Sequence, residues 1–483
     1  MDLTLERPIS QRLKRGTLAI VCLATMMLLL DIAVVNSALP SISRDLHAGL
    51  GGVQWVVDAY ALSLAALVLS AGSIADRRGR RLVFATGMVV FTGASLACAL
   101  SGGIALLDGA RAVQGLGAAL MFASSLAILA HAFPEPGERA KAMAVYGATI
   151  GASFTIGSVV GGGLTSWLGW RSVFFVNVPL GVIGLLGTFA WVRESRHPRA
   201  RKLDWPGQLA IASGMFLLVL ALLRGNLDGW ASVKTVAELA GAAAMIFAFV
   251  VIEQRVSSPL LPLGMFRRRD FTAAQIAAFG ISSTFFAIYL YITLYLQNVL
   301  GLSPLQAGLT YLPGTVLVFI VSGASANLAG RISPGALLGA GLAMVAGGLA
   351  LLTTIGPHTS WTVTLPGVLL ASLGTGIFNP TLGALALGAG PPESSGLLAG
   401  VNDAARQGGI AVGVVAFGAL VPAGAALGHG SAGAYVTGLH HALILGSGVA
   451  IVGAAMTVAL IGRRTRKPAV HVATALDLAA ESA

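Results

Sequence analysis

Residues 16–40, GTLAIVCLATMMLLLDIAVVNSALP, form one apolar run that contains a single acid, Asp31. An apolar helix needs about 20 residues to cross a bilayer, and this run is long enough. An ionised carboxylate near the middle of such a helix costs about 2.5–3.5 kcal/mol to insert. Such a group faces a cavity or a partner rather than lipid, so we expect Asp31 to be functional. The alternative is a place near the helix end, from which the side chain reaches the headgroups.

The composition indicates a polytopic membrane protein. Of the 483 residues, 56% are hydrophobic and 10% are charged, whereas soluble domains carry about 25% charged residues. The net charge of +11 does not indicate a nucleic-acid partner, because the positive residues gather in short loops between apolar runs. The first run is too long for a signal peptide and many more follow it, so we expect it to be retained as the first helix.

Fourteen apolar windows are separated by polar breaks, and we expect each to span the membrane. Their ranges are 17–39, 53–74, 82–100, 104–132, 140–167, 172–192, 206–223, 235–253, 272–298, 306–328, 334–355, 361–388, 398–421 and 438–462. With a cytoplasmic N-terminus, 24 of the 30 Lys and Arg residues fall in cytoplasmic segments, which agrees with the positive-inside rule. We therefore expect both termini in the cytoplasm. The abundance of Arg, Ala and Gly is typical of a bacterial genome, which indicates the bacterial cytoplasmic membrane.

Two basic stretches, at 193–205 and at 267–270, divide the chain into two halves. The expected order is a cytoplasmic segment (1–16), a six-helix bundle (17–192), basic loops with an inserted helix pair (193–271), a second six-helix bundle (272–462) and a cytoplasmic tail (463–483). A faint repeat, QGLGA at 114–118 and LGTGI at 373–377, favours two parallel halves, which is a transporter design.

A charged loop, GSIADRRGRR (72–81), follows the second expected helix. Gly72 would let another helix approach closely, and Gly79 permits a tight turn. We place Asp76 where the loop turns into the third helix, with that helix's N-terminus or an Arg as partner. Together with Arg77 and Arg80 it can latch two helices on the cytoplasmic face and release when they shift. The alternative is that the arginines only set the orientation.

The fourth expected helix contains DGARAVQGLGAA (108–119). Arg111, Gln114, Gly115 and Ala118 share one face of this helix by their spacing. Arg111 has no low-energy position in lipid, so we expect it to meet another helix or a water-filled cavity. An Arg beside a carboxylate holds it ionised, and a conformational shift then lets the carboxylate bind a proton. The alternative is a structural pair with Asp108, one turn earlier.

The fifth expected helix contains SFTIGSVVGGG (153–163), and WRSVFFVNVP (170–179) follows it. Small residues at four-residue spacing, among them Gly157 and Gly161 and next to them Gly162, allow close helix packing. In the second stretch, an interfacial Trp and a Pro mark the outer membrane surface and a new helix start.

These motifs together resemble those of the major facilitator superfamily, in particular its fourteen-span drug:proton antiporters. LDIAVVNSALP (30–40) resembles the first-helix motif, GSIADRRGRR the loop signature, Arg111 with Gln114 the fourth-helix proton-coupling motif, and WRSVFFVNVP the signature after the fifth helix. The chain departs from the group where Gly157 is followed by Ser158 instead of Pro. The second-half loop, GASANLAGR (323–331), also lacks an acid.

The resemblance implies an all-α integral membrane protein of two six-helix bundles plus two inserted helices. It also implies proton-coupled export of amphipathic drugs or antibiotics by alternating access, with Asp31 and Arg111 meeting between the bundles as the coupling core. The proton would be the coupling ion, with no other cofactor. The expected partners are a small-molecule substrate and the bilayer, and we expect a monomer.

Five residues are candidates for the substrate cavity: Asp58, Gln114, Phe286, Tyr289 and Asn379. Tyrosines in the seventh helix of the two bundles can stack a flat, lipophilic substrate, although packing is the alternative. Asn379 precedes a Pro that would break its helix beside the cavity. Asp58 is equally compatible with an interfacial position. Asp403 and Arg406 are expected to be a structural pair.

Other mechanisms lack a motif in this sequence. No Walker motif is present, so we expect no ATP drive, and no His/Cys cluster has metal-binding spacing. We see no nucleophile and base pair, so we do not expect an enzyme. The alternatives are a dedicated metabolite exporter or an importer of the same superfamily and, from a different class, a membrane enzyme or a sensor.

Overall fold

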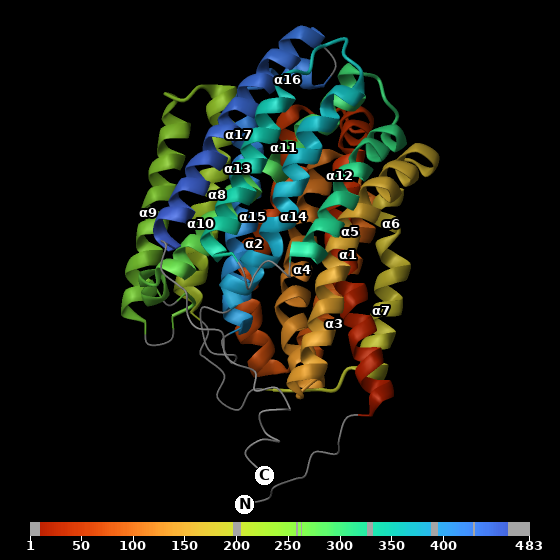
Figure 1. The fold of residues 1–483 in the computed structure, drawn as a ribbon, viewed down its shortest axis with the longest axis vertical. Helices are drawn as coiled ribbons and strands as arrows, with labels where there is room; N and C mark the ends of the chain where they lie inside the picture. The colour runs from red at the N-terminus through yellow and green to blue at the C-terminus, as the bar shows by residue number, and fades with distance from the viewer. Residues whose placement is uncertain are drawn as a thin grey trace, which may run out of the picture.

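In the computed structural model the chain is a bundle of long helices (Figure 1). The structure describes residues 10–196, 204–256, 259–261, 263–325, 332–387, 395–427 and 430–461, and no strand occurs in these ranges. The first nine residues, Arg331 and the expected tail at 463–483 lie outside them.

The elements follow the expected order of two halves and an inserted pair. The first half contains α1 (Gln11–Asp45), α2 (Leu50–Arg78), α3 (Arg80–Ala99), α4 (Ile104–Ala132), α5 (Pro136–Leu168), α6 (Ser172–Phe175) and α7 (Asn177–Trp191). The inserted pair is α8 (Trp205–Asp228) and α9 (Val233–Arg255). The second half contains η1 (Leu263–Arg267), α10 (Arg269–Ile281), η2 (Ser282–Phe286), α11 (Ala287–Leu294), η3 (Tyr295–Val299), α12 (Pro304–Ser325), α13 (Pro334–Leu352), η5 (Trp361–Thr364), α14 (Leu365–Leu387), α15 (Ser395–Gly418), α16 (Ala423–Ala426) and α17 (Ala432–Ile461).

Each of the fourteen expected spans overlaps a helix of the described residues, and the all-helical membrane class is confirmed. In the described residues, twelve of the helical spans are long and apolar enough to cross a membrane. The other two expected spans are α5 and α15, helices of 33 and 24 residues. Polar and charged residues lower the hydropathy of α15, among them Asp403, Arg406 and Gln407. The number fourteen therefore stays a prediction.

We name the two ends of the bundle after α1. The proximal pole contains the start of α1, the end of α2 and the start of α3, and the distal pole contains the end of α1. At the proximal pole Lys14 forms an ion pair with Glu138. Hydrogen bonds from Lys14 and from Gln11 lower the pKa of this carboxyl group below its ordinary value.

Glycines let the helices of the first half pack closely. A Cβ atom on Gly115 of α4 would lie 2.9 Å from the Cβ of Ser63 on α2, which is too close for any side chain. Small residues at helix contacts are the usual way for membrane helices to approach each other, because lipid supplies no hydrophobic driving force. This contact holds the α4 face that carries Arg111 against α2.

The two halves are joined near the distal pole. Gln297 of η3 donates to the Ser37 carbonyl of α1 over 2.9 Å, and Gln54 of α2 donates to the Tyr291 hydroxyl of α11 over 2.8 Å. The Leu305 amide at the start of α12 donates to Ser166 Oγ at the end of α5 over 3.0 Å. This arrangement is closed at the distal pole.

The inserted pair lies beside the junction of the halves, and α9 forms the left edge of the bundle in Figure 1. On α8, Val219 and Leu223 pack with Ala411 and Val415 of α15 and with Leu62 of α2. The pair therefore touches both halves through one helix.

Candidate functional site

Asp31 and Arg111 form an ion pair inside the first half. Nη1 of Arg111 on α4 lies 2.5 Å from Oδ2 of Asp31 on α1, and the side chains are 2% and 0% exposed. Asp108, the alternative partner one turn earlier on α4, forms no ion pair in the described residues, and its Oδ1 is buried without a donor. The pair lies within the first bundle, not between the two bundles as we expected, because both helices belong to that bundle.

A set of amides surrounds the carboxylate. Oδ1 of Asp31 accepts hydrogen bonds from Gln114 Nε2 over 2.8 Å and from Asn177 Nδ2 over 3.0 Å. Ser95 Oγ on α3 accepts from both amides, over 2.8 and 3.4 Å. Gln114, Asn177 and Ser95 are each fully buried. Both oxygens of the Asp31 carboxylate therefore have buried donors.

The guanidinium of Arg111 is held from several sides. Its Nε donates to the Val56 carbonyl of α2 over 2.8 Å, and Nη1 also donates to Gln114 Oε1 over 2.8 Å. The centre of the guanidinium lies 4.4 Å from the ring of Tyr60 and 5.9 Å from the ring of Phe174. Arg suits this site because its planar fork both stacks on rings and donates in several directions.

A small cavity adjoins the ion pair and reaches the second half. It is lined by residues of α1 and α2, by Arg111, and by Gln407 of α15. Tyr60 Oη and Gln407 Oε1 are buried and have no hydrogen-bond partner. Asp403, one turn before Gln407, lies within electrostatic range of Tyr60, and its Oδ2 is also without a donor. The polar groups on both sides of this junction are therefore available to a polar ligand or to water.

The sequence matches the model of the Major Facilitator Superfamily over residues 21–414. The chain belongs to this superfamily. It is 38% identical over 410 residues to the Multidrug resistance protein Stp of Mycobacterium tuberculosis, covering 84% of this chain and 76% of the relative. It is 34% identical to the Methylenomycin A resistance protein of Streptomyces coelicolor, covering 94% of both chains.

Solved structures of two transporters share the fold. The human organic anion transporter MFSD10 aligns with a TM-score of 0.64 and 18% identity, covering 92% of this chain and 99% of that one. A peptide transporter POT in complex with sulfate aligns with a TM-score of 0.65 and 16% identity, covering 92% and 95%. The membership indicated by the sequence motifs is thus confirmed, and it is membership in a family of transporters.

The loop signature of the superfamily connects three elements of the first half. Asp76 lies inside α2, not at the turn into α3 as we expected, and Arg80 Nη2 lies 2.9 Å from its Oδ1. Nη1 of Arg80 also donates to the Ala127 carbonyl of α4 over 3.4 Å. Gly79 has φ +118°, a backbone conformation that favours glycine. The side chain of Arg77 is exposed.

Glu194 completes this latch, and the sequence analysis missed it. One of its carboxylate oxygens accepts from the Arg81 amide over 3.1 Å and the other from the Leu82 amide over 3.2 Å, at the first turn of α3. A Cβ atom on Gly79 would lie 2.7 Å from this carboxylate. The signal was the basic first turn of α3, which offers no side-chain cap of its own.

Gly72 does not have the role that we expected. Among the described residues, nothing lies within 4 Å of the place where its Cβ atom would be. In the described residues, no helix approaches α2 so closely at this position that a glycine is required.

The three glycines of α5 place this helix between the two halves. A Cβ atom on Gly157 would lie 2.6 Å from the Ala33 side chain, and one on Gly161 would lie 2.5 Å from the Val34 Cα, both on α1. A Cβ atom on Gly162 would lie 2.5 Å from the carbonyl oxygen of Pro304 at the start of α12. The motif thus packs within the first half on one side and across the junction on the other.

The other cavity candidates lie apart from the ion pair, except Gln114. Asp58 is fully buried, neither of its oxygens has a partner, and it does not line the cavity beside Arg111. Tyr289 stacks on Tyr311 of α12, with ring centroids 4.1 Å apart. The guanidinium of Arg406 lies over Phe286, with its carbon atom 5.4 Å from the centroid of the Phe286 ring.

One further expectation is corrected. The Asn379 carbonyl Oδ1 is buried without a partner, but α14 continues through Pro380, so the helix is not broken there. Membrane helices tolerate an internal Pro where neighbouring groups satisfy the freed backbone. Arg406 and Asp403 interact electrostatically, but they form no close ion pair in the described residues, and the guanidinium of Arg406 also stacks on Phe286.

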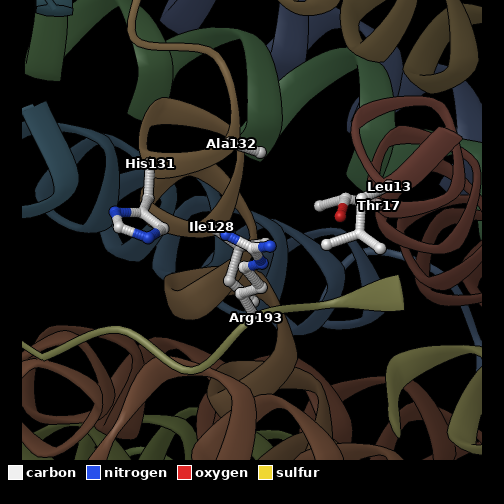
Figure 2. A pocket seen from close by; sticks show the side chains of 6 residues that line it. All are labelled: Leu13, Thr17, Ile128, His131, Ala132 and Arg193. Carbon is white, nitrogen blue, oxygen red and sulfur yellow. The ribbon is translucent and has the colours of Figure 1, made fainter. Parts of the chain in front are cut away.

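A second small pocket lies at the proximal pole, where α1, α4 and the end of α7 meet (Figure 2). His131 and Arg193 line it together with apolar side chains and Thr17, whose hydroxyl donates to the Trp191 carbonyl over 2.8 Å. Thr17 precedes Asp31 by fourteen residues, which is about 20 Å along a helix. This pocket is therefore separate from the ion pair.

Proposed function

We propose that this chain is a proton-coupled secondary transporter that exports small amphipathic drugs or antibiotics by alternating access. The observation that carries the proposal is the buried ion pair of Asp31 and Arg111, in a chain whose relatives are named as resistance proteins. A buried, hydrogen-bonded acid in a transmembrane bundle is the group that a proton-coupled cycle requires.

The geometry supports a cycle of this kind. In the arrangement closed at the distal pole, Arg111, Gln114 and Asn177 hold Asp31 ionised. Separation of the halves at this pole exposes the pair to water and lets Asp31 bind a proton. Release of this proton on the proximal side then drives the reverse motion. One elementary charge crossing about 100 mV contributes roughly 2.3 kcal/mol, which is enough to bias such a cycle.

Substrate would bind at the junction next to the pair. Tyr60 of the first half and Gln407 and Asp403 of the second half present polar atoms that lack partners here. A polar or cationic group of a substrate satisfies them, while the neighbouring apolar side chains take up its lipophilic part. We propose that the protein works as a monomer in the bacterial cytoplasmic membrane, with the proximal pole and both termini on the cytoplasmic side.

A dedicated exporter of one antibiotic is the second candidate, because the Methylenomycin A resistance protein matches 94% of both chains. Growth of an efflux-deficient host that expresses this protein, in the presence of puromycin, methylenomycin A, tetracenomycin C or ethidium, distinguishes a multidrug exporter from a dedicated one. Protection against several of these compounds supports a multidrug exporter, and protection against one supports a dedicated one.

The test of the proposed function uses inside-out membrane vesicles and ethidium. We expect uptake that starts when respiration acidifies the vesicle interior and stops when a protonophore is added. Uptake that continues unchanged after the proton gradient has collapsed would overturn proton coupling. Vesicles from cells that lack the protein are the control.

A further inference from the structure

Two buried acids meet at the proximal end of the inserted helix pair. Asp204 caps the start of α8, with Oδ1 accepting from the Gly207 amide over 2.9 Å. Glu253 lies near the end of α9, with Oε2 accepting from the Leu261 amide over 3.0 Å. Each side chain is 4% exposed.

The remaining oxygen of each acid lacks a donor and faces the other acid. Asp204 Oδ2 and Glu253 Oε1 are buried without a hydrogen-bond partner. A Cβ atom on Gly207 would lie 2.5 Å from the first and 3.0 Å from the second, so both oxygens converge on one tight spot. The two carboxyl groups are within hydrogen-bonding reach of each other.

Two ionised carboxylates buried at this distance repel each other, and one proton between them removes both the repulsion and the missing donor. We propose that Asp204 and Glu253 share one proton, which makes them a proton-binding site separate from Asp31.

No cation neutralises the pair in the described part of the chain. Of the helices packed here, the charged residues near the proximal pole are Asp76, Arg77 and Arg78 of α2, Arg255 of α9, Arg267 of η1, and Asp403 and Arg406 of α15. The charged residues farther along these helices are Asp58 of α2, Arg224 and Asp228 of α8, and Lys234 and Glu238 of α9. Arg77, Arg78, Arg255 and Arg267 have exposed side chains, and Asp76 pairs with Arg80.

The site lies between the two attachments of the inserted pair. One turn after Asp204, Gln208 accepts from Ser70 Oγ of α2 over 2.5 Å and donates to the Ala66 carbonyl. Leu261, whose amide donates to Glu253, packs with Phe271 of α10 in the second half. The shared proton therefore links the start of α8 to the end of α9. The start of α8 is bound to the first half, and the chain after α9 continues into the second half.

The test compares single and double amide variants in the purified full-length protein. In Asp204→Asn and in Glu253→Gln, one amide N–H replaces the shared proton and the other contacts are kept. In the double variant two amides face each other and no longer complement each other. Asp228→Asn, an exposed position on α8, is the control.

The readout is thermal unfolding from about pH 5.5 to about pH 9. While the shared proton is bound, the folded wild type carries one proton more than the unfolded chain, so its stability falls as pH rises, by about tenfold in the unfolding equilibrium per pH unit. The fall ends at the pH at which the folded protein releases this proton. We expect both single variants to lose this fall, Asp228→Asn to keep it, and the double variant to be less stable than either single variant at every pH. Parallel pH profiles for the wild type and both single variants would overturn the proposal.

A second readout does not depend on unfolding. The infrared spectrum of the wild type at neutral pH should contain the carbonyl stretch of a buried protonated carboxyl group, and this band should decrease in Glu253→Gln and in Asp204→Asn. A band of the same intensity in both variants would contradict a shared proton at this site. Neither readout requires transport, so both remain valid if the proposed function is wrong.

Discussion

Nη1 of Arg111 lies 2.5 Å from Oδ2 of Asp31, a residue 80 positions earlier in the chain. Both side chains are buried. Removing one member of a buried pair leaves an uncompensated charge, whereas neutralising both members leaves none. This asymmetry makes the pair testable without knowledge of the substrate.

We predict that Arg111→Ala lowers stability by about 3–5 kcal/mol, because Asp31 then lacks a cation in a buried place. Asp31→Asn combined with Arg111→Ala should be more stable than Arg111→Ala alone. Thermal unfolding in detergent measures the difference. Equal melting temperatures for the single and the double variant would mean that the two side chains do not interact.

Substitutions of Asn177 should reveal how the carboxylate is held. Asn177→Ala removes one donor to Asp31 Oδ1, which costs about 1.5–3 kcal/mol for a hydrogen bond to a charged group. Asn177→Asp, of nearly the same size, places a second carboxylate there and should be worse than Asn177→Ala at neutral pH. The comparison is made by the yield of folded protein and its melting temperature. If Asn177→Asp is the more stable variant at neutral pH, Asn177 does not donate to an ionised Asp31.

The neighbouring glycines of α5 should differ in what they disturb. Gly161→Ala collides with Val34 inside the first half and should destabilise the fold by about 1–3 kcal/mol. Gly162→Ala collides with Pro304 of the second half and should disfavour the closed distal pole. A disulfide between cysteines introduced at Ser166 and Leu305 reports this closure. We expect slower crosslinking in Gly162→Ala than in Gly161→Ala; equal rates would show that the α5–α12 contact is not the distal closure.

The cap that Glu194 provides for α3 gives a further prediction. Glu194→Ala should cost about 1 kcal/mol, as the loss of an N-terminal cap does. Gly79→Ala should cost more, because it combines a positive φ with a contact 2.7 Å from Glu194. Adding Glu194→Ala to Gly79→Ala should recover only the stability lost through the steric contact with Glu194, and not the part lost through the positive φ. Full recovery of the melting temperature in that double variant would mean that the backbone at Gly79 is unstrained.

The sequence was sufficient for the helices and for the two charged members of the site. A charge inside an apolar run is costly enough to require a partner, and this reasoning led to both Asp31 and Arg111. It did not lead to Asn177, because an amide near the start of an apolar helix has no comparable cost, and its contact with Asp31 spans 146 residues.

Contacts made across the fold were also beyond the sequence. Glu194 caps a helix that starts 114 residues earlier, and its role depends on where the chain returns after α7. The approach of Asp204 to Glu253 depends on how α8 and α9 pack. Gly72 and Pro380 show the opposite error: local rules predicted a close contact and a helix break, and the packing required neither.

The most direct test of the coupling role of Asp31 follows protons rather than drugs. Purified protein is placed in liposomes with an acidic interior and an enclosed pH dye, and ethidium is added outside. The account predicts that ethidium dissipates the pH gradient through the wild type and not through Asp31→Asn. Dissipation at the same rate through Asp31→Asn would contradict it.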